Sequence, residues 1–348
     1  MSKKRGGTMK NYNYLKTKQV NHTLWVEIHN PPVNFITADL CEELYLLIRE
    51  VEKDPGIRVF ILTGGMEDTY IFHFSIPELA HIPNDVRKMK LDTVFQSRFG
   101  RYLVENILTF NMWLMDVLPA YEKLVLSVTK MLKPFVATPF LLMQMHRCYY
   151  AIERMSKITI AAISGSCSGG GTEMGACFDF RFMVDDQGFI ISQPEIGIGI
   201  APGGGGTARL PRLIGKAKAL ELMLHAEMWT AEEAKRNGLI TDHFPKKQFH
   251  AKVQEFADNM GKRIPVAVKA IKRTVHEGMN SSLGHALCIE MGGNIQCMAN
   301  RYTQNAMQEY MQVIKDRIEE PKNGKRGTMV ELAEIMQSDE VIKRIFKD

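Results

Sequence analysis

Two glutamates each stand beside a run of glycines, and this arrangement could do acid–base chemistry. Glu173 closely follows the glycine run 169–171, and Glu195 precedes a second glycine-rich stretch, 197–206. Glycines let the backbone approach a ligand closely, and the N–H groups that begin a helix can bind an anion or a developing oxyanion. Paired carboxylates beside such loops suit proton transfer. By residue type alone, a surface glutamate and a tight turn remain alternatives.

Two other residues have the chemistry of a catalytic group. Cys167 lies in the sequence Gly-Ser-Cys-Ser-Gly, a spacing similar to a nucleophile elbow, and histidines follow it at 225, 243, 250, 276 and 285. Cysteine is often simply a small buried residue, so we expect packing rather than catalysis. His73 could act as a base, but its two phenylalanine neighbours favour a histidine satisfied inside an apolar wall.

Short strands and helices alternate around these residues. Apolar runs predict strands at 24–28, 59–63, 158–163 and 180–184. Apolar residues at helical spacing predict helices at 38–53, 172–178, from 207 onward, 216–226 and 231–237. A strand, a helix and a further strand at this spacing predict an α/β fold with parallel pairing.

Two longer stretches have the pattern of helix alone. One covers residues 77–156 and is rich in Met, Leu and aromatic residues, which favours core or oligomer contacts. After residue 249, helices are predicted at 250–262, 264–277, 282–318 and 328–346. We therefore predict a core, 13–262, with a helical insertion at about 80–156, and a C-terminal helical region with a tail, 263–348.

Composition excludes several classes of protein. The 348 residues are 45% hydrophobic and 24% charged, which excludes disordered and collagen-like chains. A net charge of +5 without basic runs that alternate with aromatics predicts no nucleic-acid partner. The six cysteines lack metal-ligand spacing, which predicts a reduced chain without a metal site. We find no secretory signal and no apolar stretch long enough to span a membrane, and expect a cytoplasmic protein.

The segments around both glutamates resemble the crotonase (enoyl-CoA hydratase/isomerase) superfamily. The similarity is carried by ITIAAISGSCSGGGTEMGACFD at 158–179, QPEIGIGIAPGGGGTARLPRLIG at 193–215, 216–224, AEEAKRNGL at 231–239 and the early NPPVN turn at 30–34. It extends over 14–79 and from 157 onward. The resemblance implies a crotonase-like spiral of β-β-α turns, followed by C-terminal helices that build a homotrimer, often paired into a hexamer.

The resemblance also implies an acyl thioester of coenzyme A as substrate, with no cofactor and no metal. Its enolate would be stabilised by two backbone N–H groups, which match Gly170 and Phe74 in this chain. Glu173 and Glu195 match the two glutamates of the family's hydratases, one to take a proton from water and one to protonate the α-carbon. Substrate contacts are implied for Pro32, Val33, Phe72, Ser75, Ile76, Gly169 and Pro194.

Around Phe74 the chain departs from the family pattern. His73 replaces a glycine and Ser75 replaces an aspartate, but an N–H donor persists whatever the side chain, proline excepted. The chain also has about 80 residues where the family has about 30, in the region that walls the acyl pocket.

The predicted function is that of an enoyl-CoA hydratase-like lyase. One alternative is a Δ3-Δ2 isomerase or decarboxylase acting on an acyl-CoA or acyl-carrier-protein thioester, because these need the same oxyanion site but only one proton-transfer group. The other alternative is a non-catalytic relative that binds acyl thioesters.

Overall fold

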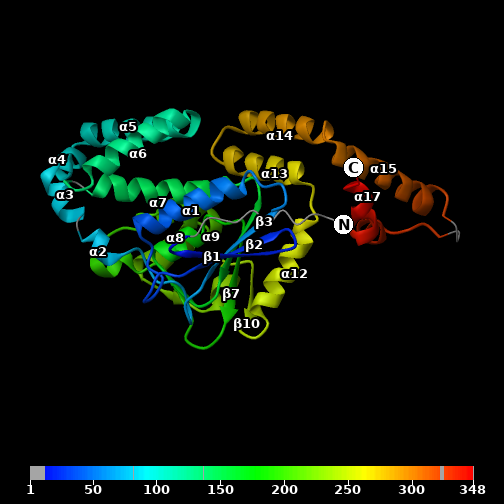
Figure 1. The fold of residues 1–348 in the computed structure, drawn as a ribbon, viewed down its shortest axis with the longest axis horizontal. Helices are drawn as coiled ribbons and strands as arrows, with labels where there is room; N and C mark the ends of the chain where they lie inside the picture. The colour runs from blue at the N-terminus through cyan, green and yellow to red at the C-terminus, as the bar shows by residue number, and fades with distance from the viewer. Residues whose placement is uncertain (1–11, 81, 136, 322–324, 348) are drawn as a thin grey trace.

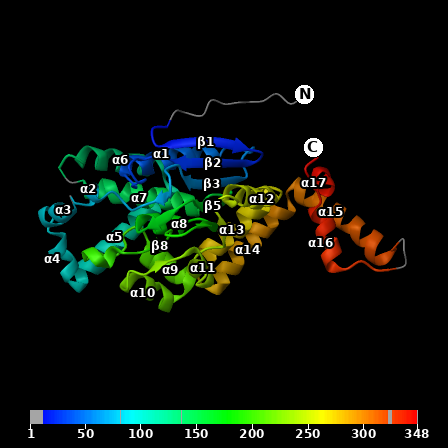
Figure 2. The same cartoon turned by 90° about the horizontal axis from the view of Figure 1, so that it is seen from below.

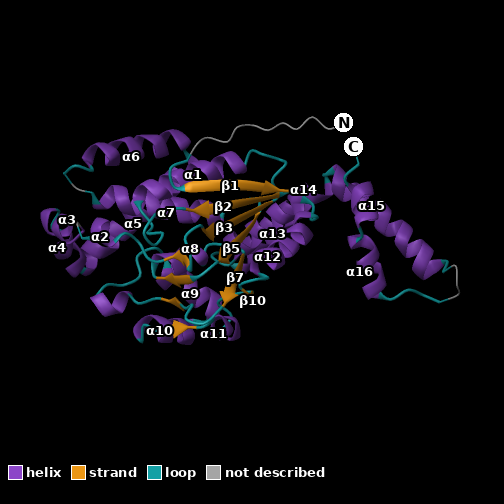
Figure 3. Cartoon of the chain, turned by 60° about the horizontal axis from the view of Figure 1, so that its bottom comes forward, coloured by secondary structure: helices purple, strands orange, loops and turns teal. Residues whose placement is uncertain are grey.

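Two β-sheets form the centre of the structure (Figure 1). The structure is a computed structural model that describes residues 12–80, 82–135, 137–321 and 325–347. The larger sheet has the strand order β1-β2-β3-β5-β7-β10, with bounds Leu15–Val20, Thr23–Ile28, Val59–Gly64, Ile158–Ile163, Phe180–Asp185 and Asp242–Pro245. The smaller sheet has the order β4-β6-β8-β9, with bounds Thr69–Ile71, Ser166–Ser168, Ile191–Ser192 and Met228–Trp229. Figure 3 shows the strands in orange.

From β3 to β8, consecutive strands alternate between these two sheets. β3 lies in the larger sheet and β4 in the smaller one, and the pairs β5–β6 and β7–β8 repeat this step. The last two pairs lead to the helices α8 (Gly170–Gly175) and, after a short 3-10 helix η1 (Glu195–Ile198), α9 (Gly206–Ile214). This is the predicted spiral of β-β-α turns, and it brings the ends of β4, β6 and β8 to one sheet edge.

Apolar residues on both faces explain the parallel part of the larger sheet. All six residues of β5 are buried, as expected for a parallel strand that is covered on both sides. α1 (Ala38–Val51) begins at Thr37, whose side chain accepts a hydrogen bond from the Leu40 N–H at 3.2 Å. The buried stripe of α1 packs against α7 (Thr138–Glu153).

The long helical stretch after β4 contains two kinds of helix. α7 belongs to the hydrophobic core, where Tyr149 and Cys148 are fully buried. The preceding helices are α2 (Ile76–Leu79), α3 (Ile82–Lys88), α4 (Leu91–Gln96), α5 (Arg98–Val117) and α6 (Pro119–Leu132). α5 and α6 lie outside α7 in Figure 1 and expose apolar side chains, among them Phe99, Tyr102, Ile107, Trp113 and Met131.

The C-terminal helices are shorter than predicted. The single helix predicted at 282–318 is wrong: α14 (Leu283–Met298) ends, and Asn300 caps α15 (Arg301–Ile314) by accepting from the Tyr302 N–H. A π-helical turn, Lys315–Glu319, follows α15. The helix predicted at 328–346 is likewise divided at Ser338, which caps the second of the helices α16 (Met329–Gln337) and α17 (Asp339–Ile345).

The remaining helices connect the sheets to this C-terminal part. They are α10 (Lys216–Leu224), α11 (Ala231–Arg236), α12 (Phe249–Gly261) and α13 (Pro265–Gly278). α15, α16 and α17 form an arm beside the core (Figure 2), and Lys262 forms an ion pair with Asp339 at 2.8 Å where α17 returns to α12. Among the described residues, none of the helices is long and apolar enough to cross a membrane.

Candidate active site

Two backbone N–H groups lie side by side where β4 and β6 end. The N atom of Phe74 would be 3.2 Å from a Cβ atom built on Gly170. Gly170 is the first residue of α8, so its N–H has no partner within the helix. In the described part of the chain, neither N–H has a hydrogen-bond acceptor. Two neighbouring donors without acceptors suit a developing oxyanion.

Backbone and side-chain hydrogen bonds hold these donors in place. The Ile36 N–H donates to the His73 carbonyl at 2.9 Å, and the Ser75 N–H donates to the Ile36 carbonyl at 2.7 Å. Both bonds fix the backbone on either side of Phe74. The Tyr149 hydroxyl donates to the Gly170 carbonyl at 2.8 Å, so α7 fixes the start of α8.

Glu173 is buried and held by the second glycine-rich loop. Its Oε1 accepts hydrogen bonds from the N–H groups of Gly204 and Gly206, both at 2.8 Å. A Cβ atom on Gly204 would lie 2.6 Å from Glu173 Oε2, so this approach requires glycine. Burial raises the pKa of Glu173 to about 7, although the two N–H donors lower it, and the nearby charge of Glu195 raises it further. A carboxyl group with this pKa can gain or lose a proton at neutral pH.

Glu195 offers the second carboxylate, at the start of η1. It is only 3% exposed, and its Oε1 accepts from the Gln193 side-chain amide at 2.9 Å. Its Oε2 is buried without a hydrogen-bond partner in the described residues. A buried oxygen of this kind costs free energy unless a partner is supplied, so it is suited to receive a water or substrate proton.

His73 is buried and both of its ring nitrogens have partners, as the prediction of a satisfied histidine requires, but one of these partners is Glu195 rather than an apolar wall. Its Nε2 is 3.5 Å from Glu195 Oε1, and its Nδ1 is 3.0 Å from the Phe74 carbonyl oxygen. The ring occupies the space that a side chain at Gly169 would need, since a Cβ there would be 2.2 Å from the ring. Burial by itself lowers the pKa of His73, but the bonds to Glu195 and the Phe74 carbonyl, with the charge of Glu195, raise it above its ordinary value.

Cys167 is fully buried on β6, as the packing interpretation predicted. Burial raises its pKa to about 12, and its Sγ lies 3.7 Å from the Thr172 hydroxyl oxygen. The thiolate required of a nucleophile is therefore not formed at neutral pH. This geometry speaks against the nucleophile elbow.

The other residues predicted to contact substrate are spread around these groups. The Phe72 N–H donates to the Val33 carbonyl at 3.3 Å, and Phe72 and Ile76 are 49% and 44% exposed. Gly169 lies beneath the His73 ring, Pro194 precedes Glu195, and Pro32 follows a cis peptide bond at the surface. Ser75 differs: its side chain accepts from the Glu78 N–H at 3.4 Å and caps α2. We assign Ser75 this capping role.

The sequence did not identify the groups that hold the two glutamates. The glycine run 203–206 was a usable signal, because repeated glycines before a helix expose several N–H groups in one loop. Gln193 was recognised only as the first residue of the Gln-Pro-Glu motif, without a role of its own. Tyr149 lies in a segment of uniform aromatic and Met composition, and nothing in that segment distinguishes it.

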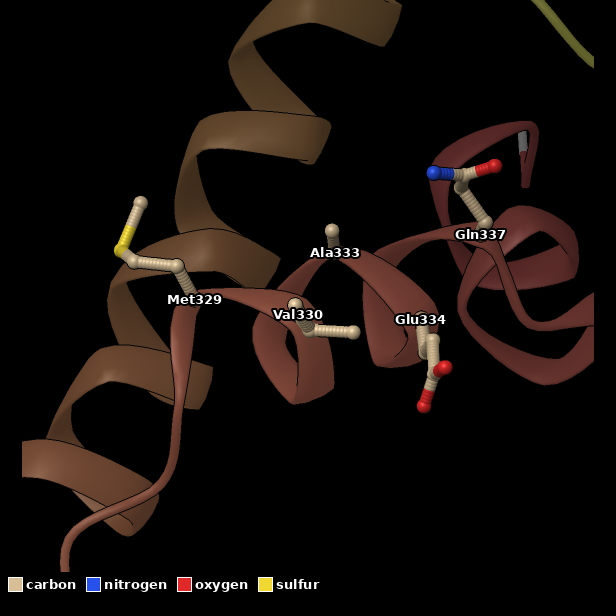
Figure 4. Close-up of a pocket in the computed structure, with 5 residues that line it drawn as sticks. All are labelled: Met329, Val330, Ala333, Glu334 and Gln337. Atoms are coloured by element: carbon tan, nitrogen blue, oxygen red, sulfur yellow. The ribbon is translucent and has the colours of Figure 1, made fainter.

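Two hollows lie away from these residues. The hollow in Figure 4 is an open face of α16, lined by Met329, Val330, Ala333, Glu334 and Gln337. A groove of about 840 Å³ lies beside α13 and includes Arg181, Lys272 and His276. Neither contains any of the predicted site residues.

We expect Glu173→Gln to stabilise the fold at alkaline pH. The pKa of Glu173 is raised from 4.5 to about 7 on folding. The stability that comes from protonated Glu173 is therefore fully present below pH 4.5 and is lost as pH rises through 7. Glutamine has no charge to bury, so at pH 8 the free energy of unfolding of the variant should exceed that of the wild type by on the order of 3 kcal/mol.

Denaturant unfolding at pH 5 and pH 8 measures this difference. The exposed Glu255, which pairs with Lys252, provides the control substitution Glu255→Gln, for which no pH-dependent difference is expected. Equal effects of Glu173→Gln at the two pH values would contradict the expected burial cost.

Comparison with known sequences gives one family. The family model described as enoyl-CoA hydratase/isomerase matches residues 141–320. A crotonyl-CoA hydratase of Syntrophomonas wolfei subsp. wolfei is 34% identical over 166 residues, which are 48% of this chain and 63% of that protein. A short-chain-enoyl-CoA hydratase of Clostridium acetobutylicum is 27% identical over 299 residues, which are 86% of this chain and 94% of that protein. The chain thus matches less than two thirds of the first relative and nearly all of the second.

Comparison with solved structures gives the same fold. An enoyl-CoA hydratase of Bacillus anthracis superposes with a TM-score of 0.66 at 22% identity, covering 86% of this chain and 96% of that one. DspI of Pseudomonas aeruginosa superposes with a TM-score of 0.66 at 18% identity, covering 89% of this chain and 98% of that one. At these identities the likeness shows the fold alone.

Proposed function

The chain belongs to the enoyl-CoA hydratase/isomerase family, and on this premise we propose that it adds water to the conjugated double bond of an enoyl-CoA thioester. The observation that carries the proposal is the presence of two buried glutamates, Glu173 and Glu195, at one pair of free backbone donors. Hydration needs one group to take a proton from water and another to protonate the α-carbon. The named hydratases among its relatives support this choice.

The N–H groups of Phe74 and Gly170 bind the thioester carbonyl oxygen in this reaction. As water adds to the β-carbon, the double-bond electrons move toward that oxygen, which becomes an enolate. Donors that are already in place stabilise this charge without reorganisation, and one such donor is typically worth about 10²–10³ in rate.

The two glutamates divide the proton transfers between them. Glu195 takes a proton from water through Oε2, the oxygen without a partner in the described residues. Glu173, whose pKa is about 7, supplies the proton that bonds to the α-carbon as the carbonyl re-forms. The proton on Glu195 must then return to Glu173 before the next turnover. The addition of water leaves the overall oxidation level of the substrate unchanged. The two glutamates supply both proton transfers, and coenzyme A serves only as part of the substrate.

Hydration of crotonyl-CoA in heavy-oxygen water tests the proposal. We expect loss of the conjugated-thioester absorbance and one labelled oxygen at the β-carbon of the product. A shifted double bond without label, starting from a 3-enoyl thioester, would support the isomerase instead. Absence of turnover on a panel of enoyl thioesters, carried on coenzyme A and on acyl carrier protein, would support a thioester-binding protein.

We also propose that the chain assembles as a homotrimer, or a hexamer of two trimers. Apolar side chains are exposed on α13 and α14, including Ile271, Val275, Leu283 and Met291. Exposed apolar faces of this extent are typical of protein interfaces. Light scattering at low micromolar concentration should give three or six times the chain mass of 39.5 kDa. A mass near that of one chain would contradict the assembly.

A further inference from the structure

The hydrogen-bonding geometry of His73 determines where its proton must lie. Nδ1 is 3.0 Å from the Phe74 carbonyl oxygen, which can only accept, so Nδ1 carries a hydrogen. Nε2 then faces Glu195 Oε1 at 3.5 Å. In a neutral ring, Nε2 would turn a lone pair toward the oxygen of an ionised carboxylate. A favourable contact therefore requires one proton between the two groups.

His73 and Glu195 are buried together, which strengthens this requirement. His73 is 8% exposed and Glu195 is 3% exposed. Gly169, at φ +49°, leaves the space in which both side chains meet: a Cβ there would be 2.2 Å from the ring and 2.8 Å from Glu195 Oε1. Charged groups separated from water interact more strongly than exposed ones.

Two titratable side chains act on His73 among the described residues. Glu195 comes from η1, and Glu173 comes from the first turn of α8. Gln193 binds the same Oε1 of Glu195 through its amide. With Oε1 engaged by both His73 and Gln193, only Oε2 remains for the reacting water.

We propose that His73 is a positioning residue that acts through Glu195. Resting on the proposed hydration, this assignment gives protonated His73 the task of pairing with Glu195 Oε1, so that Oε2 stays turned toward water. The His73 charge also acts on Glu173, because a positive neighbour favours loss of the Glu173 proton. One histidine thereby acts on both carboxyl groups.

The substitution His73→Asn tests this assignment, because asparagine can donate to Glu195 but cannot carry a charge. Without the imidazolium, Glu173 keeps its proton to higher pH, so the alkaline limb of kcat/KM should move to higher pH. The maximal kcat should also fall by roughly tenfold, with little change in KM, because a neutral donor holds Glu195 Oε1 less firmly than an imidazolium does. A lower maximum with the alkaline limb unmoved would overturn the proposal.

His73→Gly provides a second variant, which leaves a hole in place of the ring. Added imidazole should restore activity at pH 6, whereas pyrazole, a ring of similar size that stays neutral, should not. Equal rescue by both rings would overturn the proposal. His225→Asn is the matched control, because this side chain is 73% exposed and lies outside the site. Its pH profile should equal that of the wild type.

A measurement that needs no turnover separates this inference from the proposed hydration. The His73 ring resonances of the full chain, followed by proton NMR, should titrate at lower pH in Glu195→Gln than in the wild type, because Glu195 raises the pKa of His73. If the wild type lacked hydratase activity but this NMR shift were observed, the pair would be supported and the proposed hydration overturned. If the wild type were active but the shift were absent, the pair would be overturned and the hydration left intact.

Discussion

Replacing either glutamate with glutamine should lower kcat for crotonyl-CoA hydration by roughly 10²–10⁴. Glutamine keeps the shape of the side chain but cannot exchange a proton. In Glu195→Gln the water loses its base, and in Glu173→Gln the α-carbon loses its proton donor. Both variants should still fold, because Glu173→Gln removes a buried charge and the amide of Glu195→Gln can remain beside Gln193. Steady-state absorbance assays on both variants measure the effect.

The pattern across the two variants separates hydration from isomerisation. Glu255→Gln, on the exposed face of α12, is the control and should have wild-type turnover. Hydration requires both carboxyl groups, so both site variants should be impaired. If one of them kept wild-type kcat, the division of proton transfers proposed here would be wrong.

Gly170→Ala should lower kcat/KM by roughly 10²–10³, the loss typical of a removed oxyanion donor. The added Cβ would lie 3.2 Å from the Phe74 N atom and 3.4 Å from Ile36 Cδ1, in the space between the two donors. The thioester oxygen could then no longer reach both N–H groups. Rates at low substrate concentration measure this directly.

Gly175→Ala is a matched control within the same helix. A Cβ atom at Gly175 meets no atom within 4 Å, so activity should be retained. Alanine also favours helix over glycine by about 1 kcal/mol, so stability should not fall. Equal losses of activity in Gly170→Ala and Gly175→Ala would show that α8, rather than the oxyanion site, had been disturbed.

The sequence predicted the elements that have a clear hydrophobic period. The buried strand at 158–163 and the helix from Ala38 were both correct, because apolar runs and stripes mark them directly. Strands such as β8 were missed, since two residues are too short to show an alternation. The breaks at Asn300 and Ser338 were missed because apolar residues continue at helical spacing on both sides, while a single capping side chain ends the helix.

The candidate site could be predicted only where a motif carries it. The glycine run before Glu173 marked the donor at Gly170, and the Gln-Pro-Glu motif marked Glu195. The contact between His73 and Glu195 could not be predicted, because it depends on the missing side chain of Gly169 in a distant part of the chain. The binding of Glu173 by Gly204 and Gly206 depends in the same way on how a loop returns to α8.

The helices α3 to α6 lie in the chain between Phe74 and Gly170, the two proposed oxyanion donors. For a flexible loop, each doubling of length adds only about 0.6 kcal/mol to the entropy that closure must overcome. Here α7 brings the chain back against α1 before β5 begins, so the excursion starts and ends at the core. The hydrogen bonds of Ile36 on either side of Phe74, and that of Tyr149 to Gly170, therefore hold the two residues from the core rather than through the inserted helices. We therefore expect the segment from α3 to α6 to tolerate insertions and deletions while Phe74 and Gly170 keep their positions.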